Sequence, residues 1–168
     1  MEKFICSTCN EEHDLEDLSF GADSPKQWDG LTDKEKEQSE LDSDTCFIKT
    51  STEEHFFIRG CLDIPITGSD KIYTWGVWVS LSEKSMLEVC DNWENPERAQ
   101  LGPYFGWFCT EIPTYPDTLF LKASVSQQPV GVRPRIELEP TDHPLAIHQR
   151  NGIDPEILKQ KLLTLLHV

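Results

Sequence analysis

The sequence predicts an α+β fold: one domain with a mainly antiparallel sheet of about five to six strands, helices packed on that sheet, and an N-terminal Cys-x-x-Cys knuckle. Two observations carry this prediction. Segments of apolar, strand-like residues follow one another from residue 45 onward and are joined mostly by short turns. Capping residues and helical apolar spacing occur mainly toward the two ends of the chain. A chain of 168 residues suits one domain with a sizeable core.

Residues 1–44 are expected to form an acidic layer over the sheet, within a single domain that spans residues 1–168. This part holds 14 Asp and Glu against 4 Lys and Arg, whereas residues 45–168 hold 16 against 11. A helix is expected near residues 24–42, because Ser24 can cap it and Pro25 suits its first position. Thr32 offers a second possible start for this helix.

Six segments have the residue pattern of β-strands. They are residues 45–50, 55–63, 72–81, 103–112, 118–127 and 133–139. The pattern is strongest over 72–81, where Trp75 falls on one face and Trp78 on the other. Apolar side chains on both faces indicate a central strand that is covered on both sides.

Three helices are expected after the strand 72–81. Ser82 can cap a helix to about residue 93, with Cys90 on its buried stripe. Asp142 can cap a short helix to about residue 150, and Gly152 would end it. Asp154-Pro155 opens a last helix, whose apolar side chains would pack on the sheet.

The composition argues against several classes of function. The chain carries 15 Lys and Arg against 30 Asp and Glu, a net charge of −15, which disfavours binding to a nucleic acid backbone. No apolar run approaches the ~20 residues that a membrane span needs, and no signal-peptide pattern opens the chain. We therefore expect a cytoplasmic globular protein that contacts neither nucleic acid nor membrane, with a protein as the conceivable partner.

The six cysteines do not suggest a disulfide framework, because no secretory context is visible. Cys61, Cys90 and Cys109 occur in apolar patterns and are expected in the core, where a free cysteine behaves as a small hydrophobe. Cys6, Cys9 and Cys46 are the cysteines left as candidates for chemistry.

Cys6-x-x-Cys9 followed by His13 has the spacing of a metal site. Two thiolates three residues apart can bind one tetrahedral ion from a tight turn, which makes Zn²⁺ the expected cofactor, in a structural role. Asn10 follows the second cysteine, where such knuckles need a positive φ that Asn tolerates. Candidates for the fourth ligand are Cys46, His143 and His148. The alternatives are a redox pair, or two reduced thiols without a role.

Ligand binding is the other chemistry that individual residues suggest. Arg59 interrupts an apolar strand, so it either holds a carboxylate or phosphate ligand or forms a buried ion pair, with Asp63 or with an acid of residues 137–142. Glu137 and Glu139 point to one side of their strand, close to His143 in sequence. Such a group can do acid–base work or bind a divalent cation, or it is a solvated strand edge with a helix cap.

The aromatic segments are candidates for the lining of a pocket. Trp75, Trp78 and Trp107 lie beside glycines that leave room next to their rings, although aromatic strands also occur simply as core. The chain has no Gly-x-Ser-x-Gly, Walker or His-Glu-x-x-His motif, so we assign no catalytic residue and favour a binding protein over an enzyme.

Several longer motifs occur in order along the chain. They are Ser19-Phe20-Gly21-Ala22-Asp23, Phe56-Phe57-Ile58-Arg59-Gly60, residues 75–82, residues 102–107, residues 115–119 and residues 137–145. With these motifs the chain resembles, over nearly its whole length, a bacterial family known as domain of unknown function 2199. The resemblance implies a bacterial, intracellular protein of one domain and supplies no activity. Members of the family begin with Cys-x-x-Cys-Gly and a nearby His, and Asn10 departs from that pattern.

Three hypotheses about function follow. The first is a non-enzymatic binding or accessory protein with a structural zinc site. The second is an acidic protein that binds a basic protein partner through residues 11–44, as toxin-neutralising proteins do. The third is a small enzyme that uses Arg59, Glu137, Glu139 and His143 around an aromatic pocket.

Overall fold

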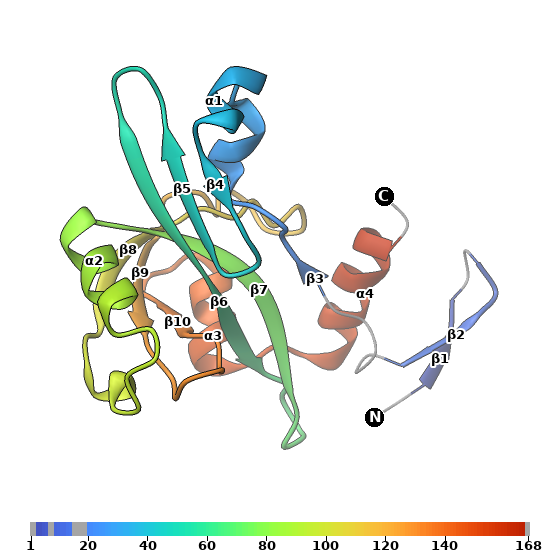
Figure 1. The fold of residues 1–168 in the computed structure, drawn as a ribbon. Coiled ribbons are helices and arrows are strands. Elements are labelled where there is room, and N and C mark those ends of the chain that lie inside the picture. The colour runs from blue at the N-terminus through green and yellow to red at the C-terminus, as the bar shows by residue number, and fades with distance from the viewer. Residues whose placement is uncertain (1–2, 7–8, 15–19, 167–168) are drawn as a thin grey trace.

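The computed structural model describes residues 3–6, 9–14 and 20–166. A closed barrel of five strands forms the main body (Figure 1). Its strands are β6 (Glu54–Pro65), β7 (Ile72–Leu81), β8 (Tyr104–Phe108), β9 (Lys122–Ser126) and β10 (Arg135–Leu138). Neighbours around the ring pair antiparallel, except that β10 meets β6 in parallel at Arg135 and Cys61.

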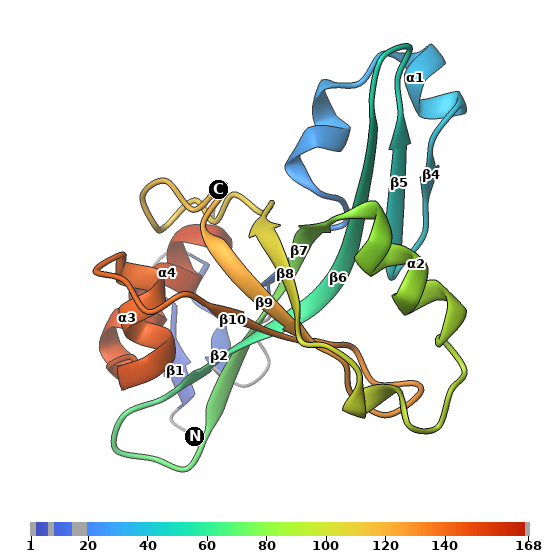
Figure 2. The same cartoon turned by 90° about the vertical axis from the view of Figure 1, so that its left-hand side faces the viewer.

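Three more strands extend the sheet beyond the barrel. β5 (Thr45–Lys49) pairs with β6, β4 (Glu40–Leu41) pairs with β5, and β3 (Phe20–Gly21) pairs in parallel with β7. Figure 2 shows β4, β5 and the first residues of β6 rising from the barrel as an arm. A separate hairpin of β1 (Lys3–Ile5) and β2 (Glu12–Asp14) lies on the side of the molecule where the last helix lies (Figure 1).

The helices cover the arm and the ends of the barrel. They are the 3-10 turns η1 (Lys26–Gly30) and η2 (Arg98–Gln100) and the α-helices α1 (Asp33–Glu37), α2 (Glu83–Asp91), α3 (Pro144–Asn151) and α4 (Pro155–Leu166). Ser82 caps α2 as predicted, since its hydroxyl accepts the Ser85 N–H at 3.1 Å. Gly152 ends α3 with a φ of 90°.

Two apolar clusters lie on opposite faces of β7. Trp75, Val77 and Val79 point into the barrel and belong to the larger cluster. Trp78 points outward and joins Cys46, Ile48, Phe57 and Cys109 in the second cluster. The side chains that cover this outer cluster come from the N-terminal part: Ala22, Trp28, Leu31 and Leu41. β7 is therefore covered on both faces, as its sequence predicts.

Two glycines permit the close approach of strands that shapes the barrel. A Cβ on Gly60 would lie 2.6 Å from the Ile136 side chain and 2.8 Å from the Pro134 carbonyl oxygen, where β6 meets β10. A Cβ on Gly106 would lie 2.2 Å from the Ser80 carbonyl oxygen, where β8 meets β7. A larger residue at either position would push the strands apart.

The α+β class is confirmed, but the architecture differs from the prediction. The described sheet has eight strands instead of five to six, and five of them close into a barrel. The two-residue strands β3 and β4 are too short to show any alternation of apolar residues.

The prediction of one helix over residues 24–42 is wrong. The segment forms η1, the five-residue α1 and β4, with Leu31 extended between the two helical pieces. Pro25 precedes η1 as its N-cap, and Thr32 caps α1 in a capping box with Glu35. The segment has no continuous apolar stripe, so its few apolar residues pack individually on the outer cluster instead of forming a helix face.

Three smaller predictions also fail. His143, not Asp142, is the N-cap of α3, where its ring nitrogen accepts the Leu145 N–H at 3.1 Å. Cys90 is exposed, because Met86 and Val89 are the residues that α2 buries. In α4 Leu158 and Leu162 are buried, whereas Ile157 is 45% exposed and Leu166 is 42% exposed.

Candidate functional site

The N-terminal hairpin brings together the three residues that the sequence predicts as metal ligands. The two sulfurs of Cys6 and Cys9 and a ring nitrogen of His13 all lie within 4.8 Å of one another. His13 Nε2 is 3.2 Å from Cys9 Sγ. Zinc bonds of about 2.3 Å to sulfur and about 2.0 Å to nitrogen put tetrahedral ligand atoms roughly 3.4–3.8 Å apart, so small adjustments would accommodate an ion.

Local backbone structure explains why these side chains converge. Cys6 follows β1 and His13 lies in β2, whose residues pair as Ile5 with Glu12 and Phe4 with His13. The knuckle turn is closed by the Cys6 N–H on the Glu11 carbonyl and the Asn10 N–H on the Cys6 carbonyl, both at 2.9 Å. Asn10 has a φ of 61°, the left-handed conformation expected at this position.

The electrostatics of the Cys6 and Cys9 thiols favour a cation between their sulfurs. A hydrogen bond from the Glu11 backbone lowers the pKa of the Cys9 thiol, but desolvation and the adjacent Cys6 sulfur outweigh it and raise the pKa overall. Two neighbouring thiols resist becoming thiolates together unless a positive charge compensates them. A divalent cation supplies that charge, and its binding would release protons from the thiols.

The proposed fourth ligands lie elsewhere. Cys46 is fully buried in the outer cluster, and burial, with a contribution from Asp42, raises its pKa to about 12. His143 caps α3 and contacts the Pro116 carbonyl oxygen. His148 Nδ1 is 2.7 Å from the Tyr115 hydroxyl oxygen. Among the described residues, the metal-ligand group therefore comprises Cys6, Cys9 and His13.

Arg59 lies on the outer face of the barrel, against the backbone of two glycines. A Cβ on Gly21 would come within 2.9 Å of Arg59 Nη2, and one on Gly76 within 3.6 Å. Its Nε is buried and has no hydrogen-bond partner among the described residues. The ion pairs among the described residues do not include one between Arg59 and Asp63, and Asp63 accepts the Thr74 hydroxyl at 2.6 Å. A ligand role for Arg59 stays a prediction.

The three tryptophans predicted to line one pocket occupy three different environments. Trp75 is fully buried inside the barrel, and Trp78 is fully buried in the outer cluster. Neither indole has surface that a ligand can touch. Trp107 is 42% exposed on β8 and stacks edge to face with Phe105. Trp107 is thus the one member of this set that is positioned to contact a ligand.

The acidic group around residue 140 is not gathered in one cavity. A cavity of about 390 Å³ beside α3 is lined by Glu137, with Asp63, Arg135 and Arg150 as its other charged residues. Arg59, Glu139 and His143 are not among its lining residues. Glu137 and Glu139 are both exposed, and the enzyme hypothesis gains no assembled site from the described residues.

A partly buried group of polar side chains joins α3 and α4 to the segment before β9, and sequence reasoning missed it. Tyr115 bonds His148, and Lys161 lies 3.8 Å above the Tyr115 ring while it donates to the Thr114 carbonyl at 2.7 Å. Burial lowers the pKa of both His148 and Lys161, and for His148 the nearby Lys161 adds to the effect. No local motif links residues this far apart in sequence.

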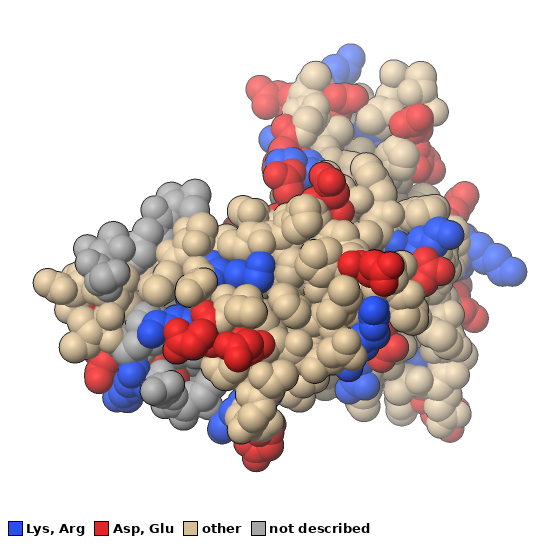
Figure 3. All heavy atoms as spheres, turned by 180° about the vertical axis from the view of Figure 1, so that it is seen from behind, with Lys and Arg blue, Asp and Glu red and all other residues tan. Residues whose placement is uncertain are grey.

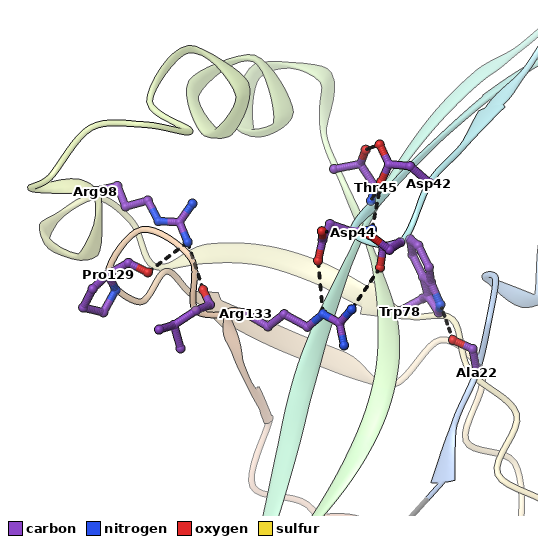
Figure 4. Close-up of polar contacts among 10 residues, drawn as sticks. Ala22, Asp42, Asp44, Thr45, Trp78, Arg98, Pro129 and Arg133 are labelled. Atoms are coloured by element: carbon purple, nitrogen blue, oxygen red, sulfur yellow. Dashed lines mark hydrogen bonds and ion pairs between the residues drawn. The ribbon is translucent and has the colours of Figure 1, made fainter.

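A second set of polar contacts fixes the loops around the barrel and the arm (Figure 4). Arg98, which is 3% exposed, donates to four backbone carbonyls, two of them Pro129 and Val132. Arg133 Nε donates to the Asp44 carboxylate at 3.1 Å. The Trp78 indole N–H donates to the Ala22 carbonyl at 2.8 Å and so anchors the N-terminal layer to β7.

The face drawn in Figure 3 carries no concentrated acidic patch for a basic partner. Figure 3 shows, on the back of the molecule, small groups of acidic and basic side chains scattered over a largely uncharged surface. Within residues 11–44, Lys26 approaches Asp29 at 3.9 Å and, across to the barrel, Glu111 at 3.5 Å. A basic partner for residues 11–44 stays a prediction.

Comparisons with known proteins give a family and no activity. Neither the curated proteins nor the solved structures contain a match to this chain. None of the described helices combines the length and the apolar composition that crossing a membrane requires. A family model described as an uncharacterized protein conserved in bacteria matches residues 5–153, from the knuckle to the end of α3. The chain therefore belongs to the bacterial family known as domain of unknown function 2199.

Proposed function

We propose that this protein is a binding or accessory protein whose N-terminal hairpin holds a structural Zn²⁺ through Cys6, Cys9 and His13. The observation that carries the proposal is the convergence of two sulfurs and an imidazole nitrogen within 4.8 Å of one another. Thiolate and imidazole are the ligands that zinc prefers in structural sites.

The hairpin has a structural need for such an ion. β1 and β2 have three residues each, and a two-stranded hairpin of that size is at best marginally stable in water. An ion bound to the turn and to β2 would join both strands. At a free zinc concentration a thousand times its dissociation constant, binding adds about 4 kcal/mol to the stability of the bound form.

The test compares two single-cysteine variants of the full chain, purified without chelator. Cys9→Ser removes a ligand, and Cys90→Ser removes an exposed cysteine of α2 that lies outside the group. We expect about one zinc per chain in the wild type and in Cys90→Ser, and none in Cys9→Ser. Cys6 and Cys9 should resist alkylation until the metal is removed.

Two further measurements separate a structural ion from an incidental one. Loss of zinc should accelerate amide exchange in β1 and β2 and lower the melting temperature of Cys9→Ser relative to Cys90→Ser. Zinc that stays with Cys9→Ser at an unchanged melting temperature would contradict the proposal. So would a wild-type protein that binds no metal and whose thiols react freely.

A further inference from the structure

A cleft beside α2 is lined by aromatic, acidic and small polar side chains. It has a volume of about 480 Å³ and lies between the start of β6, the end of β7, the start of α2 and β8. In Figure 2 this is where β7 passes into α2 beside the arm. Its lining includes Glu54, Phe56, Glu83, Phe105 and Trp107, and none of the metal-ligand group. The cleft is therefore independent of the zinc site.

An exposed aromatic pair forms one wall of the cleft. Phe105 is 54% exposed and Trp107 is 42% exposed, with ring centroids 5.1 Å apart and planes at 83°. Both rings project from the outer face of β8, because the residue between them is the inward-facing Gly106. Phe56 is half-buried and packs edge to face against Phe47 at 5.9 Å. Two large aromatic rings exposed to solvent favour the binding of a partner that buries them.

The charged residues that line the cleft favour a positively charged partner. Glu54 and Glu83 are exposed carboxylates of the cleft, and none of the described residues that line it is Lys or Arg. His55 faces Glu53 at 2.9 Å. Two basic residues outside the lining lie in register with it: Lys49 on β5 pairs with Glu54, and Lys122 on β9 pairs with Trp107. The net charge of −15 attracts cations from a distance, so an anionic ligand is disfavoured.

We propose that this cleft binds a basic polypeptide segment by taking up an arginine side chain between the Phe105–Trp107 pair and the carboxylates of Glu54 and Glu83. A planar guanidinium can stack on an indole while its N–H groups reach carboxylate oxygens. Lysine would bind more weakly, because an ammonium group does not stack in this way. The occupant is thus an arginine-bearing segment of a second protein.

The probe is a fluorescein-labelled peptide, Gly-Arg-Gly-Arg-Gly, with both ends blocked, and its matched control carries citrulline in place of arginine. Citrulline keeps the shape and removes the charge. Anisotropy titration of the full-length wild-type protein should give saturable binding of the arginine peptide and at least tenfold weaker binding of the citrulline peptide. Equal affinity for the two peptides would overturn the proposal, and so would the absence of binding.

Four variants distinguish the cleft from general attraction to an acidic protein. Trp107→Leu and the double variant Glu54→Gln/Glu83→Gln should each weaken arginine-peptide binding about fivefold or more. Glu94→Gln/Glu97→Gln makes the same change in net charge at exposed acids outside the cleft, and should stay within twofold of the wild type. Trp107→Phe keeps an aromatic face and should fall between the wild type and Trp107→Leu.

The outcomes decide the proposal in either direction. Equal weakening by the two glutamine double variants would show that net charge alone attracts the peptide, and would overturn the assignment of the cleft. Unchanged binding by Trp107→Leu would overturn the role of the aromatic pair. The altered side chains are exposed, so we expect the variants to fold, and their melting curves check this.

Discussion

Gly106→Ala tests whether the close contact between β7 and β8 supports both the barrel and the aromatic cleft. The added Cβ would lie 2.2 Å from the Ser80 carbonyl oxygen and 2.4 Å from Val79 Cγ1. Ordinary contacts of a Cβ are about 3.4 Å or longer, so relief requires a shift of roughly 1 Å between the two strands. The oxygen belongs to the backbone, and a side-chain rotation therefore cannot relieve the contact.

The expected cost follows from what that shift would disturb. Overpacking a well-packed core costs about 1–3 kcal/mol, and each weakened strand hydrogen bond adds about 1 kcal/mol. Gly106 pairs with Leu81 at the end of this ladder, so at least one such bond is at risk. We expect a loss of about 3 kcal/mol in the free energy of unfolding, which corresponds to a fall of about 6–12 °C in the melting temperature.

Urea denaturation followed by circular dichroism measures this loss, with Gly30→Ala as the matched control. A Cβ on Gly30 would meet no atom within 4 Å, so the same substitution there should change stability by less than about 1 kcal/mol. Gly106→Ala should also weaken binding of the arginine peptide, because the substitution displaces the strand that carries Phe105 and Trp107. Equal stability of the two alanine variants would refute the inferred close contact.

Two further predictions concern the partly buried His148 and the buried Arg98. Burial, with help from Lys161, lowers the pKa of His148, so the folded state resists its protonation. Stability from this group should therefore be complete above the unfolded-state pKa of about 6.5 and should decline as the pH falls below it. Melting temperatures of His148→Gln should fall less than those of the wild type between pH 7 and pH 5, and parallel curves would contradict this. Arg98→Met removes the donor to four backbone carbonyls, so it should lower the free energy of unfolding in urea by about 3 kcal/mol or more. Arg98→Lys should recover only part of that free energy. A wild-type midpoint for Arg98→Met would show that these bonds contribute nothing to stability.

The sequence predicts well those structural features that depend on residues close together in the chain. The strand 72–81 agrees with the structure at both ends, because its apolar residues specify both faces. The Ser82 cap and the positive φ of Asn10 are likewise determined by neighbours a few residues away. The Cys6–Cys9–His13 spacing converges as expected, because one tight hairpin holds all three residues.

Features that depend on distant contacts were not predictable in the same way. Barrel closure requires β10 to reach β6 over Gly60, and a glycine in an apolar strand does not indicate which strand will approach it. The acidic charges of the cleft come from the start of β6 and the start of α2, and its aromatic wall comes from β8. Nothing in the local pattern separates the exposed Trp107 from the buried Trp75, since alternation leaves the covered face unspecified.

X-ray absorption at the zinc edge, on full-length protein purified without chelator, tests the central claim most directly. The proposal predicts a shell of two sulfurs at about 2.3 Å and at least one nitrogen at about 2.0 Å, from Cys6, Cys9 and His13. The Cys9→Ser variant should lose the metal, and Cys90→Ser should keep the wild-type spectrum. A spectrum with only oxygen and nitrogen ligands, or a protein without zinc, would contradict the assignment of this hairpin as a zinc site.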